Sequence, residues 1–148
     1  MRQIRMNEQI TVGGQPTEPD MQQLAAEGFR TIVNLRRPGE SDQMLSPEEE
    51  GLKARQLGMV YIHLPVASKE MRIEQVDNFS ERLSAAPQPA YVHCGKGGRA
   101  AMFAVLDAAE REGWNADEAI EQVCNLGYSC DTPEAQEFVR GYLRTRRR

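Results

Sequence analysis

Short apolar runs rich in β-branched residues alternate along the chain with longer segments whose apolar residues recur at helical spacing. The short runs predict strands at Thr31–Leu35, Met59–His63 and Pro89–Val92. The longer segments predict helices at Thr17–Gly28, Ser46–Gly58, Ile73–Ser84, Arg99–Glu112, Asn115–Gly127 and from Thr132 onward. This alternation predicts an α/β fold with a mostly parallel central sheet flanked by helices.

Residues at the ends of these segments define the predicted boundaries. Thr17 and Ser46 each precede an acidic residue by three positions, which is the spacing of a capping box. In the segment after Asn115, the helical spacing places Cys124 with the core, beside Val123. Tyr128 is expected to pack between the late helices.

The composition bounds the class of protein. The 148 residues predict one domain over residues 1–148, whose last residues, 144–148, form a solvated basic tail. The formal net charge of -4 argues against a nucleic acid or an anionic membrane as partner. No apolar run approaches the roughly 18 residues of a membrane span, and the start lacks the apolar core of a signal peptide. We therefore expect a cytoplasmic protein.

The cysteine count limits the possible chemistry. The chain has three cysteines, Cys94, Cys124 and Cys130, and this low, odd number argues against a secreted disulfide framework. The chain has two histidines and no Cys-x-x-Cys pair, so neither a metal site nor a cofactor is expected. The chemistry should therefore come from the side chains and the backbone.

The segment His93-Cys94-Gly95-Lys96-Gly97-Gly98-Arg99 joins the third predicted strand to the next helix. Ligands of such folds bind at the carboxyl ends of the strands. The three glycines let the backbone turn its N–H groups toward one anion, and the helix N-terminus adds positive potential. Cys94 at the base of this loop is expected to be a nucleophilic thiolate. Arg99 offers paired N–H donors to an oxyanion, and Lys96 adds positive charge at the rim.

The pattern His93-Cys94-x-x-Gly97-x-Arg99 resembles the signature loop of cysteine-dependent phosphatases and rhodaneses. Three further segments narrow the resemblance: Gly13–Thr17, Gly28–Arg36 and Ile62–Val66. Together they resemble the phosphatase-like domain family of beta-lactamase-hydrolase-like proteins, over roughly Val12 to Leu106. The resemblance implies a dual-specificity-phosphatase-like three-layer fold.

Two features of the sequence differ from phosphatases of this class. Those enzymes place five residues between the cysteine and the arginine, and an aspartate protonates the leaving oxygen of their substrate. Four residues separate Cys94 from Arg99, the length that rhodanese-type sulfurtransferases use. The loop Val66–Glu70 contains no aspartate, which leaves Glu70 as the candidate general acid or as a solvated charge. Both departures favour transfer of sulfane sulfur over hydrolysis of a phosphoester.

The leading hypothesis is therefore a rhodanese-like sulfurtransferase. Cys94 takes sulfur from a small anionic donor and passes it to a thiol such as glutathione. The alternative is hydrolysis of a phosphomonoester through a phosphocysteine, and the third hypothesis is a non-catalytic module that binds an anion. The expected catalytic residues are Cys94, Arg99 and His93. The expected anion-binding residues are Gly95, Lys96, Gly97, Gly98 and Arg36.

Two residues outside the loop complete the candidate site. Arg36 follows a neighbouring strand, where it either assists the loop or pairs with Glu40 at the surface. Gln15 is expected to hydrogen-bond the backbone of the loop.

Overall fold

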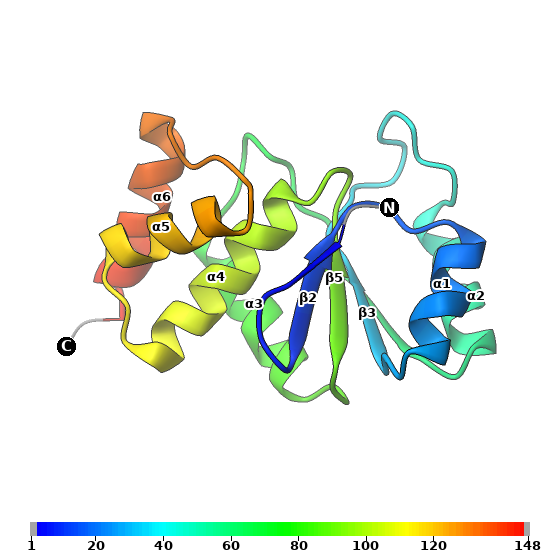
Figure 1. Ribbon diagram of the computed structural model, residues 1–148. Helices are drawn as coiled ribbons and strands as arrows, with labels where there is room; N and C mark the ends of the chain where they lie inside the picture. Colours follow the sequence, from blue (N-terminus) through cyan, green and yellow to red (C-terminus); the bar gives the residue numbers. More distant parts are fainter. Residues whose placement is uncertain (1–2, 147–148) are drawn as a thin grey trace.

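The structure is a computed structural model that describes residues 3–146. One sheet lies between two layers of helices, which gives the expected three-layer α/β fold (Figure 1). The strands are β1 (Gln3–Arg5), β2 (Ile10–Gly13), β3 (Thr31–Asn34), β4 (Val60–His63) and β5 (Ala90–His93). The helices are α1 (Glu18–Ala26), α2 (Pro47–Gln56), α3 (Ile73–Ser84), α4 (Gly98–Glu112), α5 (Ala116–Asn125) and α6 (Pro133–Arg144).

The strand order β1-β2-β5-β3-β4 places β5 inside the sheet, between β2 and β3. All neighbouring pairs are parallel except β1 with β2. In the register, His93 of β5 pairs with Gly13 on one side and with Asn34 on the other. The parallel strands therefore end together, and Cys94 emerges at their common carboxyl edge.

The predicted helix boundaries are confirmed at their caps. Thr17 and Ser46 each form a capping box with the acidic residue three positions later. The cap side chain accepts that residue's backbone N–H, and the acidic side chain accepts the backbone N–H of the cap residue. Asn115 caps α5 in the same way. Helix α4 begins one residue earlier than expected, at Gly98, because Gly97 in the left-handed region already ends the loop.

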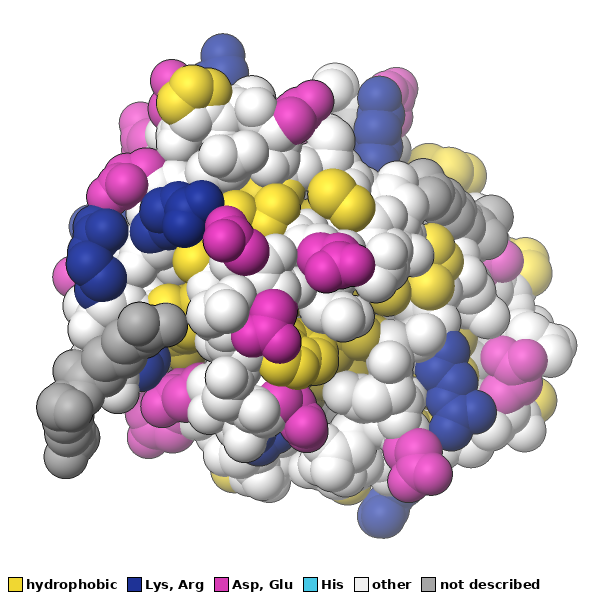
Figure 2. Space-filling model, turned by 60° about the vertical axis from the view of Figure 1, so that its left-hand side comes forward, with side chains coloured by type: hydrophobic (Ala, Val, Ile, Leu, Met, Phe, Trp, Pro, Cys, Tyr) yellow, Lys and Arg dark blue, Asp and Glu magenta, His cyan; other side chains and the backbone are white. Residues whose placement is uncertain are grey.

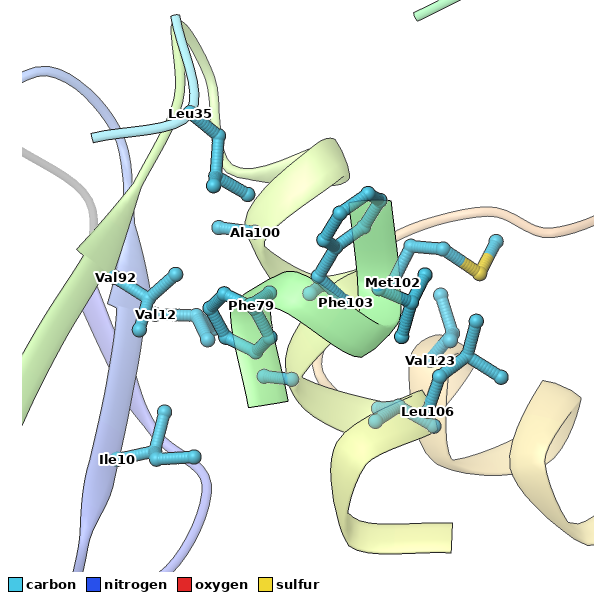
Figure 3. Close-up of a cluster of buried hydrophobic side chains, with 14 of the residues drawn as sticks. Ile10, Val12, Leu35, Phe79, Val92, Ala100, Met102, Phe103, Leu106 and Val123 are labelled. Carbon is cyan, nitrogen blue, oxygen red and sulfur yellow. The ribbon is translucent and has the colours of Figure 1, made fainter. Parts of the chain in front are cut away.

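Two apolar clusters cover the two faces of the sheet. The smaller one, around Met21, Leu24 and Ile32, lies under α1 and α2. The larger one lies under α3–α6, where Val12 and Val92 of the sheet point toward Phe79 and Phe103 (Figure 3). The two phenyl rings meet edge to face, with centroids 5.7 Å apart. This packing fixes α4, whose first turn forms part of the Cys94 loop.

One expectation about a side chain is wrong, and a second holds only in part. Cys124 is exposed, since the buried face of α5 runs through Ala119 and Val123, and the next residue turns away from the core. In the tail expected to be solvated, Arg144 and Thr145 are exposed, whereas Arg146 is partly buried over the ring of Tyr142, with 4.2 Å between its guanidinium carbon and the ring centroid. Residues 147 and 148 of that tail lie outside the described residues.

The face formed by the late helices carries mixed charge (Figure 2). Acidic side chains are scattered over its middle, basic ones lie mainly toward its edges, and small apolar patches separate them. Within residues 3–146, no helix has the length and apolar character that crossing a membrane requires.

We predict that Leu106→Ala in α4 lowers the free energy of unfolding by about 2–5 kcal/mol, because Leu106 is fully buried and its removal leaves a cavity. Leu52→Ala deletes the same atoms from a side chain that is 55% exposed, and it should change stability by no more than about 0.5 kcal/mol. Urea denaturation of both variants measures the difference. Equal effects would contradict the assignment of the core.

Candidate active site

The Cys94 sulfur lies at the base of the loop that joins β5 to α4, with only 2% of the residue exposed. The backbone N–H of Gly97 donates a hydrogen bond to Cys94 Sγ at 3.1 Å. Helix α4 starts at the next residue, so its N-terminal partial positive charge adds to that of the amide. One backbone N–H and the N-terminus of α4 thus place positive potential at the sulfur.

The segment after β2 holds the base of this loop. Gln15 donates its backbone N–H to the carbonyl of Gly95 at 3.2 Å, which confirms the expected contact with the loop backbone. A Cβ on Gly14 would lie 3.0 Å from the same carbonyl oxygen, so the close approach requires a small residue there. Tyr91 anchors this segment from below by donating its hydroxyl to the Gly14 carbonyl at 2.6 Å.

Tyr128, from the turn between α5 and α6, closes the other side of the loop. Its hydroxyl donates to the Lys96 carbonyl at 3.1 Å. Gly97 adopts φ +111°, and a Cβ there would overlap the Tyr128 hydroxyl. Tyr128 was expected only to pack between helices. In the structure it also contacts the short loop directly.

Glu40 engages Arg99 from a loop 59 residues away in the sequence. Arg99 donates Nη1–H and Nη2–H to the two Glu40 carboxylate oxygens, at 2.6 and 2.8 Å, and a second Nη1–H to the Val66 carbonyl at 2.7 Å. A guanidinium has five N–H donors, so Glu40 and Val66 leave Nε–H and one Nη2–H unused, and Arg99 also interacts with the Cys94 side chain.

The electrostatics of this pair follow from the contacts. Hydrogen bonds from Arg99, from the Arg37 backbone and from Arg36 lower the pKa of Glu40 to about 2, against the effect of its partial burial. Hydrogen bonding to Glu40 raises the pKa of Arg99, and the nearby Cys94 acts in the same direction. Both partners are therefore charged at neutral pH.

A buried polar network lies beneath the loop. The fully buried His93 donates Nε2–H to the equally buried Glu50 carboxylate at 2.6 Å, and its Nδ1 lies 3.2 Å from the Cys94 carbonyl. Gln15 links Glu50 to Arg36, with hydrogen bonds of 2.6 and 3.0 Å. Together these contacts fix the orientation of His93 under the loop.

The predicted site residues converge on one cavity of about 470 Å³. Its cationic side chains are Arg36, Lys96 and Arg99, and its acidic side chains are Glu40 and Asp42. Cys94, Gly95 and Gly98 also line the cavity, whereas Gly97 and His93 support it from behind. The volume is that of a small-ligand site.

Arg36 lines the Cys94 cavity but is largely engaged by protein acceptors, and Glu70 lies outside the lining of this cavity. Three of the Arg36 nitrogens already donate to protein acceptors, Glu40, Gln15 and the Ser41 carbonyl, so its main contacts hold the site together. Glu70 lines a neighbouring cavity of about 360 Å³ instead of the Cys94 cavity. From the loop Val66–Glu70, only Ser68 lines the Cys94 cavity.

Sequence reasoning missed three carboxylates of the site. Glu40 was considered only as a surface partner of Arg36, and Asp42 was not considered. For Glu50 a signal exists, because it shares the inward face of α2 with Pro47 and Ala54 at helical spacing. A charged residue on a buried helix face needs a partner, and here the partner is His93.

The fold and a cysteine held in an amide-lined loop ahead of an arginine define a cysteine-dependent enzyme of the phosphatase-like class. Residues 2–140 match the family described as DSP-PTPase phosphatase fused to NAD+ Kinase, so the chain belongs to this family. The resemblance to beta-lactamase-hydrolase-like proteins is also confirmed. The chain is 33% identical over 109 residues to the beta-lactamase hydrolase-like protein of Agrobacterium fabrum.

That match covers 74% of this chain and 25% of the relative, so the chain spans about a quarter of the length of the relative. Among solved structures, a DUF442 protein of Shewanella putrefaciens superposes with a TM-score of 0.83 at 21% identity, covering 99% of this chain and 93% of the other. TpbA of P. aeruginosa superposes with a TM-score of 0.74 at 20% identity, covering 94% and 83%. These superpositions establish the shared fold.

We predict that Gly97→Ala lowers activity by a factor on the order of 100, because the new methyl group displaces either the loop or Tyr128 by about an ångström. Gly98→Ala is the matched control, since a Cβ there meets nothing within 4 Å and its φ is not positive. Steady-state kinetics of the two variants tests the difference. Comparable losses would contradict the role of the Gly97–Tyr128 contact.

The lowered pKa of Glu40 predicts that the free energy of unfolding depends on pH. Its folded pKa of about 2 lies below the ordinary value of 4.5, so its ionised form stabilises the native state above about pH 4.5. This contribution is lost as the pH falls toward 2 and the carboxylate takes up a proton. The stability difference between the wild type and Glu40→Gln should therefore be constant above that window and shrink within it. Urea denaturation from pH 6 down to about 2 measures the difference, and a pH-independent difference would refute the assignment.

Proposed function

We propose that this protein hydrolyses phosphomonoesters through a phosphocysteine on Cys94. The observation that carries the proposal is the Arg99 guanidinium, which Glu40 holds beside the Cys94 side chain while leaving Nε–H and one Nη2–H unused by Glu40 and Val66. Two oxygens of a phosphoryl group match such a pair of N–H donors, and the loop amides would bind the third. Membership in a family described by its phosphatase domain supports this choice over sulfur transfer.

In the first step, the Cys94 thiolate attacks the phosphorus atom and the ester oxygen departs. Arg99, Lys96 and the loop N–H groups would stabilise negative charge on the transferred group. In the second step, water attacks phosphorus, the S–P bond breaks and its electron pair returns to sulfur. Inorganic phosphate then leaves.

The cavity also suggests the class of substrate. With a volume of about 470 Å³ it has room for a phosphoryl group and part of its leaving group. TpbA, which shares the fold, is known in a complex with phosphotyrosine. An aryl phosphate is therefore the first substrate to test.

Sulfane-sulfur transfer is the second candidate, and the length of the loop favours it. Four residues between Cys94 and Arg99 make a tighter ring with one fewer N–H, which suits a single extra sulfur on Cys94 better than a tetrahedral phosphoryl group. The donor would be thiosulfate or a persulfide, and the acceptor a thiol such as glutathione. A non-catalytic anion-binding module is less well supported, because binding alone does not require a thiol beneath the anion site.

Three assays on one preparation separate these functions. We expect the wild type to release phosphate from p-nitrophenyl phosphate and Cys94→Ser to lose this activity, because a serine hydroxyl at this position is not ionised. The same two proteins are incubated with thiosulfate plus cyanide and with glutathione persulfide. Thiocyanate formation or persulfide consumption that depends on Cys94, without phosphatase activity, would instead establish sulfur transfer. No Cys94-dependent activity in any of the three assays would support the non-catalytic anion-binding module.

A further inference from the structure

Hydrolysis of an ester with a poor leaving group needs a proton donor, and the three glutamates near the site are poor candidates for this role. Glu40 accepts hydrogen bonds from two arginines and from the Arg37 backbone, which keep it ionised. Glu50 is fully buried beneath the loop, bonded to His93 and Gln15. Glu70 lies in the neighbouring cavity. Glu40 and Glu50 are therefore unavailable as proton donors, and Glu70 is outside the lining of the Cys94 cavity, although its own cavity shares Glu40, Ser68 and Arg99 with it.

Asp42 is the remaining carboxylate, and it lines the same cavity as Cys94 and Arg99. Among the described residues outside glycine it alone has a positive φ, 59°. This left-handed conformation is strained for a residue with a Cβ, although aspartate tolerates it better than most residues. The side chain is exposed to the cavity solvent and takes part in no hydrogen bond or ion pair within the part of the chain that the structure describes.

The residues on both sides of Asp42 are firmly held. The Ser41 carbonyl accepts an N–H from Arg36 at 2.7 Å. The Gln43 side chain accepts the Gly39 N–H at 2.9 Å and donates to the Arg37 carbonyl at 3.3 Å. The strained backbone of Asp42 thus lies in a loop that is tied to the arginines of the site, and the free carboxyl group projects from it.

We propose that Asp42 is the proton donor to the leaving group, supplied from the loop after β3 in place of an aspartate in the loop Val66–Glu70. This inference rests on the proposed phosphatase function. The loop that holds Arg99 through Glu40 would then also carry the general acid. One segment would then fix both the anion-binding guanidinium and the proton donor.

The step balances as follows. As the S–P bond forms and the P–O ester bond breaks, the protonated Asp42 carboxyl transfers its proton to the departing oxygen and becomes a carboxylate. In the second step, this carboxylate takes a proton from the water that attacks the phosphocysteine. The thiolate of Cys94 and the protonated Asp42 are restored when phosphate leaves.

The test compares Asp42→Asn with the wild type on two aryl phosphates, phenyl phosphate and p-nitrophenyl phosphate. Loss of a general acid should lower kcat on phenyl phosphate, the poorer leaving group, by about 100-fold or more, and on p-nitrophenyl phosphate by far less. Asp131→Asn, an exposed aspartate outside the Cys94 cavity, is the matched control and should leave both rates unchanged. A merely structural role of Asp42 would lower both rates by the same factor.

Each other outcome overturns the assignment. Equal rates for Asp42→Asn and the wild type on both substrates, with an active wild type, refute the role of Asp42 and leave the phosphatase function intact. If Glu70→Gln gives the leaving-group dependence and Asp42→Asn does not, Glu70 is the acid. If the wild type hydrolyses neither ester, the proposed function fails and the role of Asp42 fails with it.

Discussion

The hydrogen bond from the Gly97 amide to the Cys94 sulfur is the contact on which the site depends. It exists because the chain turns back within three residues, which Gly97 permits through its positive φ. The N–H that points at the sulfur fixes the Cys94 side chain at the base of the loop. The sheet supports this turn from one side, where β5 lies between two parallel strands, and Tyr128 supports it from the other.

Two carboxylates extend this support beyond the loop. Glu40 fixes the guanidinium of Arg99 at the rim, and Glu50 fixes His93 underneath. A buried ion pair adds little net stability, because desolvation offsets the attraction, but it costs several kcal/mol to break by removing one partner. Their contribution is therefore best understood as orientation of the site. Gln15 and Arg36 join the two carboxylates, so rim and base are parts of one network.

Much of this architecture could be predicted from sequence, because it depends on local signals. Helix caps, the three apolar strands and the glycine-rich loop each follow from a few adjacent residues. Strand β2 was not predicted, since its four residues, Ile10–Gly13, acquire meaning only beside β5, about 80 residues later. The pairs Glu40–Arg99 and Glu50–His93 span 59 and 43 residues; Glu40 looks like an ordinary surface charge in the sequence, and the helical spacing that marks Glu50 as buried does not reveal its partner. Contacts at such separation are set by the tertiary fold, which no local pattern encodes.

The central claim is that the loop binds an oxyanion directly over a reactive Cys94 thiolate. Alkylation by iodoacetamide at about pH 6, followed by peptide mass spectrometry, tests it most directly, because only a thiolate reacts readily. The protein carries its own reference in Cys124, which is exposed whereas Cys94 is buried. The account predicts faster modification of Cys94 than of Cys124, and inorganic phosphate should slow the reaction at Cys94 alone. Faster modification of Cys124, or no protection of Cys94 by phosphate, would contradict it.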